Sequence, residues 1–188
     1  MNNYKKNLEL LTRNHVYSQE MEHDACGVGL IASTEGKKSR AVVEYGIEAL
    51  KAVWHRGAVD ADGKTGDGAG IHVEIPKDFF IEKIEVTGHD YDNSEICVGM
   101  IFLPKNDYSS QENCKTIVES ELTKNNFSIY GWRQVPVNPK ILGEKALQTM
   151  PEIIQVLFKS NDPNLLDKNL ERKIYETRKR IENKAFDA

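Results

Sequence analysis

Residues 21–33 read MEHDACGVGLIAS, and the interpretation of the whole chain depends on this stretch. Cys26 stands directly before a short apolar run punctuated by glycines and followed by the turn-like segment TEGKKS, residues 34–39. Such a run predicts a buried strand over residues 26–33. A cysteine at the start of a strand is most often a small buried hydrophobic residue. The alternative is that the preceding residues are removed and Cys26 becomes an N-terminus.

An N-terminal cysteine can be a nucleophile that carries its own base. A free α-amine has a pKa of about 8, so it can take the proton of the neighbouring thiol without a separate histidine. This chemistry requires cleavage of the Ala25–Cys26 bond, which a small Ala25 and a polar preceding segment would permit. Residues 1–25 contain no continuous apolar stretch, which argues against a secretory signal and leaves a short pro-segment open.

The composition is that of a soluble, single-domain globular protein. Of 188 residues, 39% are hydrophobic and 29% charged, and the net charge is −4 with the basic residues dispersed. We therefore expect neither a nucleic-acid nor a membrane surface. The three cysteines show no CxxC spacing and the five histidines no HExxH motif, so no metal site is predicted. Sparse, unpaired cysteines favour a reducing, cytoplasmic location.

The first predicted helix covers residues 39–57. Its apolar residues recur at helical spacing, Ser39 can cap its start, and Gly57 can end it. The apolar stripe consists of Val43, Ile47, Leu50 and Trp54. The segment that follows, AVDADGKTGDGAG over residues 58–70, is rich in glycine and aspartate and predicts a tight loop with close backbone packing.

The remaining segments predict an α+β fold with a largely antiparallel sheet. Short connections between strands favour antiparallel pairing, with the helices packed on the sheet. The expected strands are residues 69–76, 96–104 and 127–137. The first expected helix covers residues 109–126 and is opened by Asp107 or by a Ser109–Glu112 capping box. Helical pieces are expected within residues 143–160, broken at Pro151. A charged amphipathic helix is expected over residues 164–185, and the residues on its apolar face are Leu166, Leu170, Ile174 and Ile181.

Two further features could carry chemistry. Arg56 offers a planar five-donor fork to a carboxylate, although an arginine near a helix C-terminus more often only complements the helix dipole. The stretch DGKTGDGAG, residues 62–70, superficially suggests a phosphate-binding loop. It lacks the GxxxxGK[ST] order and runs toward a predicted strand, where that motif leads into a helix, so nucleotide binding is not expected.

Three long stretches together resemble a known family. These are EHDACGVGLIA, then GIEALKAVWHRGAVDADGKTGDGAGIHVEIP, then IYGWRQVPVN. They are similar to the start of the large subunit of glutamate synthases, which is a class II glutamine amidotransferase domain of the N-terminal-nucleophile hydrolase superfamily. The resemblance runs from about residue 20 to the end of the chain. It implies a four-layer αββα sandwich of two antiparallel sheets, whereas the residues alone predict only an antiparallel sheet with helices.

The resemblance also implies roles for individual residues. Cys26 takes the nucleophile position, Ala25 is the last residue of a propeptide over residues 1–25, and residues 26–188 are the N-terminal part of the amidotransferase domain. Arg56 belongs to the HRG motif, whose arginine lies near the nucleophile and helps to bind the substrate. No metal ligand is implied, and Cys97 and Cys114 are not expected to be cluster ligands.

The implied reaction is hydrolysis of glutamine to glutamate and ammonia. In complete glutamate synthases the ammonia adds to 2-oxoglutarate, with electrons from NADPH or ferredoxin passing through an iron–sulfur cluster and FMN. The implied partners are glutamine, the remaining synthase domains and a small subunit. No cofactor is expected in these 188 residues.

The sequence departs from the family in one respect. Residues 57–188 contain neither the Asn-Gly pair that forms the oxyanion hole nor the stretch carrying a second substrate-clamping arginine. We therefore expect an incomplete domain that is inactive by itself. An alternative is a non-catalytic remnant or scaffold piece that binds a partner. A class II amidotransferase of amino-sugar or purine synthesis fits less well, because those proteins have a shorter leader and lack the AVDADGKTGDGAG form.

Overall fold

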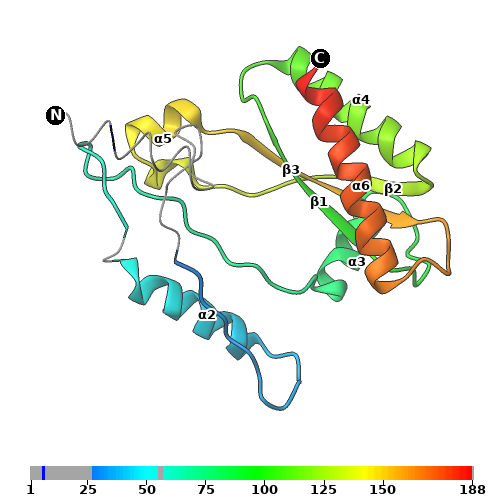
Figure 1. The fold of residues 1–188 in the computed structure, drawn as a ribbon, viewed down its shortest axis with the longest axis horizontal. Helices are drawn as coiled ribbons and strands as arrows, with labels where there is room; N and C mark the ends of the chain where they lie inside the picture. The colour runs from blue at the N-terminus through cyan, green and yellow to red at the C-terminus, as the bar shows by residue number, and fades with distance from the viewer. Residues whose placement is uncertain (1–5, 7–26, 55–56, 188) are drawn as a thin grey trace. The chain divides into compact units, whose positions relative to one another are not determined.

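The computed structural model describes residue 6, residues 27–54 and residues 57–187 (Figure 1). The chain divides into two compact units, Met1–Ala52 and Val53–Ala188, which are described separately. Ala25, Cys26 and Arg56 lie outside the described residues.

In the first unit, the prediction of a strand over residues 26–33 is wrong for the part that the structure describes. Residues 27–33 form no strand, and Val28 and Leu30 are 94% and 89% exposed. A strand needs a hydrogen-bonded neighbour, and none pairs with these residues within the described part of the chain. The predicted helix over residues 39–57 is confirmed in part as α2 (Arg40–Ala52), and Ser39 Oγ accepts a hydrogen bond from Ala41 N as expected of its cap. The helix ends at Ala52, before the expected end at Gly57, and Trp54 of the predicted apolar stripe is 75% exposed.

The second unit is built on one antiparallel sheet. Its strands are β1 (Cys97–Leu103), β2 (Phe127–Gln134) and β3 (Glu152–Ser160), in the order β1-β3-β2. Both neighbours run antiparallel to the central β3, which confirms the α+β class and the antiparallel sheet. A register shift between Ile129 and Gly131 bends β2.

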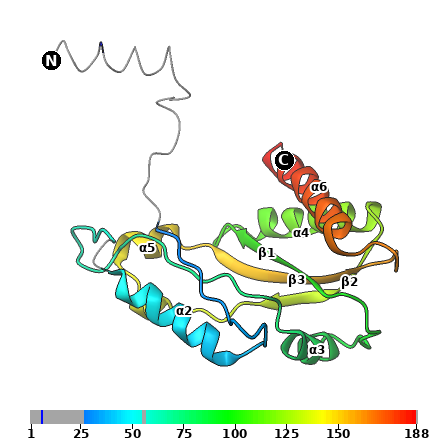
Figure 2. The same cartoon turned by 60° about the horizontal axis from the view of Figure 1, so that its bottom comes forward.

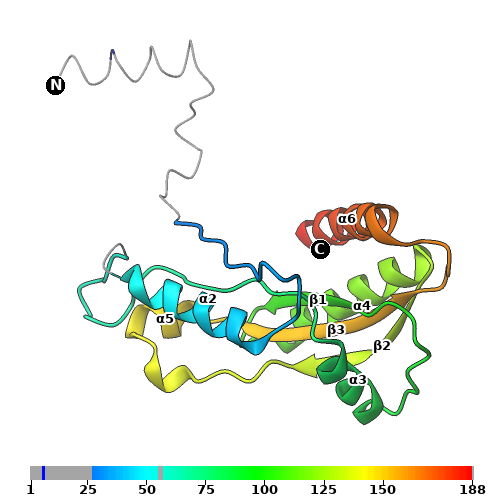
Figure 3. The ribbon, with the colours of Figure 1, turned by 90° about the horizontal axis from the view of Figure 1, so that it is seen from below.

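Helices cover both faces of this sheet, as Figures 2 and 3 show. On one face lie α4 (Tyr108–Lys124) and α6 (Asp167–Phe186), packed around a core that includes Phe127, Val156 and Phe158. On the other face lies α3 (Lys77–Val86), with Ile84 packed against Leu157 and Tyr130. The apolar residues of β3 are therefore buried on both faces, as expected of a central strand.

Most of the predicted helices and strands are confirmed. The strands over 96–104 and 127–137 are β1 and β2, and the helices over 109–126 and 164–185 are α4 and α6. Asp107, one of the two proposed caps, is the cap of α4, because its Oδ1 accepts from Ser110 N at 3.0 Å. On α6 the expected apolar face packs on the core through Leu170, Ile174 and Ile181, while Leu166 is 51% exposed.

Two further predictions, both in the second unit, are wrong. In residues 69–76, apolar and other residues alternate as in a half-buried strand. The segment nevertheless forms no strand, and Ile71 and Val73 are both 46% exposed. Residues 143–160 are predicted to contain helical pieces broken at Pro151. Only α5 (Glu144–Thr149) is a helix, and the segment after Pro151 is the central strand β3. A short apolar run buried on both sides has no period that distinguishes strand from helix.

One short element completes the description of the second unit: a 3₁₀ turn, η2 (Pro139–Ile141), precedes α5. Helix α3 begins directly after Pro76. Among the described residues, no helix combines the length and the apolar composition that a membrane crossing requires.

Candidate functional site

The loop that directly follows Arg56 is the best-defined part of the candidate site. Gly57 N donates to Trp54 O at 3.0 Å, and the chain then forms a narrow hairpin over residues 58–67. Val59 and Gly66 form an antiparallel bridge, and Asp60 N donates to Thr65 O at 2.7 Å. We call residues 57–67 the acidic hairpin, because Asp60, Asp62 and Asp67 all lie in it.

Carboxylates organise the acidic hairpin from within. Asp62 Oδ1 accepts from Thr65 N at 2.7 Å and from Lys64 N at 2.9 Å, while Asp62 Oδ2 accepts from Thr65 Oγ1 at 2.5 Å. Asp67 Oδ2 accepts from Ala58 N at 2.8 Å and ties the two arms together. Gly63, at the tip, has a φ of 68°, a conformation that glycine adopts without strain.

These hydrogen bonds lower the pKa of Asp62 well below its usual range. The largest cause is the hydroxyl of Thr65, followed by the backbone N–H groups of Thr65 and Lys64. The loss of solvation opposes this lowering of the pKa, and the backbone N–H of Lys145 adds to it. Each of these donors stabilises the ionised carboxylate, so Asp62 is charged throughout the neutral range.

The acidic hairpin is not a phosphate cradle. A phosphate-binding loop directs free backbone N–H groups at the anion. Here the N–H groups of Ala58, Ala61, Lys64 and Thr65 already donate to aspartate carboxylates of the same loop. These N–H groups are therefore not free to bind a phosphate, which supports the prediction that this stretch does not bind a nucleotide.

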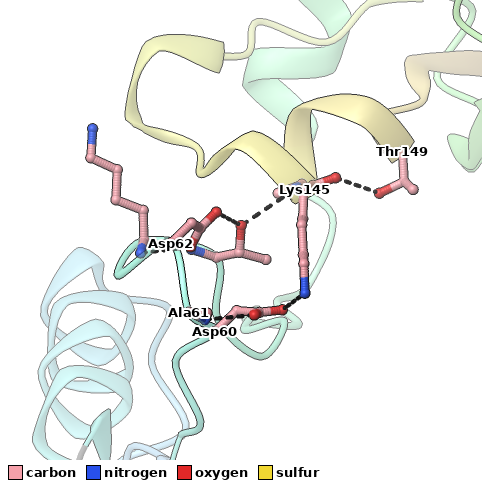
Figure 4. A network of polar contacts seen from close by, with 8 residues as sticks. Asp60, Ala61, Asp62, Lys145 and Thr149 are labelled. Carbon is pink, nitrogen blue, oxygen red and sulfur yellow. Dashed lines mark hydrogen bonds and ion pairs between the residues drawn. The ribbon is translucent and has the colours of Figure 1, made fainter.

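The acidic hairpin is anchored to α5 by contacts between residues 81 and 85 apart in the sequence (Figure 4). Lys145 Nζ donates to Asp60 Oδ2 at 2.6 Å, and Ala146 N donates to Thr65 Oγ1 at 3.4 Å. The N-cap of α5 is Gly143, which has no side chain to accept a hydrogen bond, so Thr65 supplies the missing acceptor.

Gly143 is required by this anchoring. A Cβ at this position would lie 2.5 Å from Thr65 N and would overlap the side chains of Asp62 and Thr65. Real Cβ atoms do not approach a backbone nitrogen this closely, so any other residue would displace the hairpin. Sequence analysis missed Gly143, Thr65 and Lys145; the only signal was the GEK segment at the start of α5.

The described residues hold no set of side chains suited to a metal or a cluster. No group of three or more histidine, cysteine, aspartate or glutamate side chains lies together in residues 27–54 or 57–187. Cys97 is buried in the core, and burial, followed by the charges of Glu95 and Glu171, raises its pKa to about 12. Cys97 is therefore a protonated core thiol and does not fit the role of a thiolate ligand.

Comparison with known proteins shows which family residues 26–188 match. The family model described as class-II glutamine amidotransferases matches this whole range. The chain is 52% identical over 179 residues to a glutamate synthase [NADPH] large chain from Azospirillum brasilense, covering 95% of this chain and 12% of that protein. It is 41% identical over 162 residues to a ferredoxin-dependent glutamate synthase 1 from Arabidopsis thaliana, covering 86% of this chain and 10% of that protein.

The chain thus spans about a tenth of the length of these curated relatives. The family match begins at Cys26 and includes Arg56, the acidic hairpin, the sheet and its helices. The mixed helical and antiparallel architecture agrees with the α+β class of the fold implied by the sequence resemblance. The strands of the described residues form one three-stranded sheet, whereas the implied sandwich has two sheets. The chain belongs to the class-II glutamine amidotransferases, a family of enzymes.

Proposed function

We propose that this chain is the glutaminase portion of a glutamate synthase, with Cys26 as an N-terminal nucleophile. The observation that carries the proposal is the start of the family match at Cys26 itself, the residue that the chemistry needs at an N-terminus. The two glutamate synthases that match at 52% and 41% identity support the same assignment.

In the proposed reaction, the free α-amine of Cys26 takes the proton of its own thiol. The thiolate Sγ attacks the side-chain amide carbon of glutamine, and the carbonyl electron pair moves to oxygen. The protonated amine then gives its proton to the amide nitrogen, the oxyanion electron pair re-forms the carbonyl, the C–N bond breaks, and ammonia leaves a γ-glutamyl thioester. The free amine takes a proton from water as the water oxygen attacks the thioester carbon. The carbonyl re-forms again, the C–S bond breaks, and the amine returns the proton to Sγ as glutamate leaves.

Arg56 is proposed to bind the substrate. Its guanidinium can pair with the α-carboxylate of glutamine through two parallel hydrogen bonds, which fixes both position and orientation. Orientation matters because the attacking sulfur must meet the amide carbon at close range. The support for this role is that Arg56 lies within the range matched by the class-II amidotransferase family.

The wider reaction is proposed from the relatives. One is named for NADPH and the other for ferredoxin, so either donor suits a complete synthase. We propose that ammonia from this site is transferred to 2-oxoglutarate by the remainder of a large subunit, with or without a small subunit. FMN and an iron–sulfur cluster are assigned to that remainder, because the described cysteines do not fit a cluster.

Residues 1–25 are proposed to be a propeptide whose removal exposes Cys26. Within residues 57–188 there is no Asn-Gly pair to stabilise the oxyanion, a contribution that typically amounts to roughly 3–4 kcal/mol in such sites. We therefore expect nucleophile chemistry at Cys26 but no measurable glutaminase turnover by the purified 188-residue chain. Sustained ammonia release from glutamine by that chain would contradict this expectation.

The proposal is tested with one folded protein in two forms. Residues 20–25 are replaced by the site of a sequence-specific protease, and the purified chain is left uncut or is cut so that Cys26 is N-terminal. Both forms are treated with a diazoketone analogue of glutamine and analysed by mass spectrometry. We expect labelling of Cys26 in the cut form only, with protection by glutamine. Equal labelling of both forms, or none, would refute the nucleophile assignment.

A further inference from the structure

We propose that a groove between the C-terminal parts of α4 and α6 binds a small phosphate-bearing anion, either inorganic phosphate or a phosphate monoester. The groove lies wholly within the second unit and is independent of the reaction proposed at Cys26. Its volume of about 380 Å³ is at the small end of the range for small-molecule pockets. The lining residues are Glu121, Lys124, Asn125, Arg180, Asn183 and Lys184.

The charges that line the groove do not balance. Three cationic side chains share it with a single carboxylate, that of Glu121, which leaves an excess of two positive charges. Glu121 is 4% exposed, and its Oε1 accepts from Lys184 Nζ at 2.5 Å and lies 3.5 Å from Lys124 Nζ. Because this carboxylate is already held by two lysines, the excess charge remains available to a ligand with two negative charges.

Arg180 is the cation that the fold does not pair. Its two predecessors on α6, Arg178 and Lys179, both form ion pairs with Glu182. Within residues 27–54 and 57–187, the guanidinium of Arg180 has no hydrogen-bond or ion-pair partner. Arg180 also stands four residues before Lys184, a spacing at which like charges on a helix repel each other. A bound anion would relieve this repulsion.

The protonation of Lys184 reflects the same arrangement. The hydrogen bond to Glu121 is the largest influence and raises the pKa of Lys184, so this side chain stays charged at neutral pH. The loss of solvation and the charge of Arg180 both act in the opposite direction. The two cations are therefore close enough to affect each other electrostatically.

The helix dipoles explain only part of this cluster. Lys124 and Lys184 lie in the last turns of α4 and α6, where a positive charge is favourable, but Arg180 lies one turn earlier. The carbonyl groups at the end of α4 would repel an anion. Asn125 caps them, because its N and Nδ2 donate to Glu121 O at 3.1 and 2.8 Å.

A phosphate group matches the donors of the groove. A guanidinium can donate two parallel hydrogen bonds to a phosphate, and a lysine ammonium adds a point charge. The side-chain amide of Asn183 lines the same groove and can donate to a further oxygen. A phosphate monoester carries a charge of about −1.5 to −2 at pH 7, close to the excess positive charge here, whereas a monocarboxylate carries only one negative charge.

The test is a titration of the 188-residue chain with sodium phosphate, at an ionic strength held constant with sodium chloride. Binding is followed through the backbone amide NMR signals of Lys124, Asn183 and Lys184. Glycerol phosphate is used in a second titration and sodium acetate in a third. Tighter binding of glycerol phosphate than of inorganic phosphate would assign a monoester as the ligand, and equal or weaker binding would assign the inorganic ion.

Three variants separate the groove from general electrostatic attraction. Arg180→Gln removes the unpaired guanidinium, and Glu121→Gln removes the negative charge but retains an acceptor for Lys184. Arg178→Gln is the matched control, because it removes the same charge from the same helix, in the exposed pair with Glu182. Far-UV circular dichroism and urea unfolding establish that each variant is folded.

We expect the wild type to bind phosphate saturably, with a dissociation constant of about 1 mM. Arg180→Gln should raise this constant at least ~5-fold, and Glu121→Gln should lower it ~2- to 5-fold. Arg178→Gln should change it less than ~2-fold, because Arg178 does not line the groove. Acetate should bind at least ~5-fold more weakly than phosphate.

Two results would overturn the site. One is the absence of saturation with either phosphate compound up to ~20 mM. The other is an equal effect of Arg180→Gln and Arg178→Gln on the dissociation constant, a comparison that decides even if Glu121→Gln does not fold. Acetate binding as tight as that of phosphate would overturn the assignment of a phosphate group as the ligand.

Discussion

Gly99 of β1 lies directly opposite Val156 of β3, and the valine side chain fills the space that a side chain at Gly99 would occupy. A Cβ at Gly99 would come within 2.7 Å of Val156 Cγ1, closer than real Cβ atoms approach a neighbour. Val156 is 2% exposed and belongs to the core shared with α4 and α6. The absence of a side chain at Gly99 is therefore part of the core packing.

We expect Gly99→Ala to lower the free energy of unfolding by about 1–3 kcal/mol, because the added methyl must displace a buried valine or the strand itself. Urea unfolding followed by far-UV circular dichroism measures the change. Gly70→Ala is the control, since a Cβ at Gly70 meets nothing within 4 Å. If both variants unfolded at the same urea concentration as the wild type, the packing described for β1 against β3 would be incorrect.

The buried carboxylate of Glu121 links α4 to α6. Glu121 is 4% exposed, and its Oε1 accepts from Lys184 Nζ at 2.5 Å. This hydrogen bond is the main cause that lowers the pKa of Glu121; burial opposes it, and the charges of Lys184 and Lys124 add to it. A lowered folded-state pKa means that the contribution to stability is complete above the unfolded value of about 4.3 and is lost as the pH falls through the folded value.

We therefore expect Lys184→Met to lower the urea midpoint at pH 7 and to have progressively less effect as the pH falls below about 4. Lys179→Met removes a lysine from the exposed pair with Glu182 and should change the midpoint little at either pH. A destabilisation by Lys184→Met of the same size at pH 7 and at pH 2 would show that lost packing, and not the ion pair, is responsible.

The two described cysteines should differ sharply in reactivity. Cys97 is 3% exposed, and burial raises its pKa to about 12, so the reactive thiolate is strongly disfavoured at pH 8. Cys114 lies on α4 and is partly exposed. We expect iodoacetamide to modify Cys114 in the native protein and Cys97 only after unfolding in urea, as measured by peptide mass spectrometry. Rapid native modification of Cys97 would contradict its placement in the core.

The acidic hairpin should respond to acid through Asp62. Its pKa is held well below the usual range, so its ordering effect is complete above about pH 4 and is lost only as the pH falls through the lowered value. We expect Asp62→Asn to accelerate amide exchange at Lys64 and Thr65 at neutral pH, because a neutral amide oxygen accepts these two N–H groups more weakly than the carboxylate oxygen Oδ1 does. The amide nitrogen that replaces Oδ2 also cannot accept from Thr65 Oγ1. Exchange at Ala58, which depends on Asp67, serves as the internal control.

The sequence predicted those elements whose local signals agree with their packing. Helix α4 has a capping aspartate and an uninterrupted helical segment, and α6 has an apolar face at helical spacing that packs on the core. Strands β1 and β2 are short apolar runs bounded by turn residues. In each case, local preference and tertiary contact favour the same structure.

The predictions that failed concern segments whose secondary structure depends on tertiary contacts and not on the local sequence. The run EIIQVLFKS has no period that separates helix from strand, and only its place between β1 and β2 makes it the central strand. Residues 69–76 have the alternating pattern of apolar residues that is typical of a strand, but no strand pairs with them among the described residues. The anchor between Asp60 and Lys145 joins residues 85 apart, so no local pattern could predict it.

The central claim, that Cys26 is a nucleophile activated by its own α-amine, is tested most directly by the rate of its labelling in the cut and uncut forms of the same chain. The diazoketone analogue of glutamine is used across pH 6 to 9, with Cys114→Ala as the background. We expect labelling of the cut form at least ~10²-fold faster than the uncut form, rising with a pKa of about 8 and slowed by glutamine. Equal rates in the two forms, with no protection by glutamine, would contradict the claim.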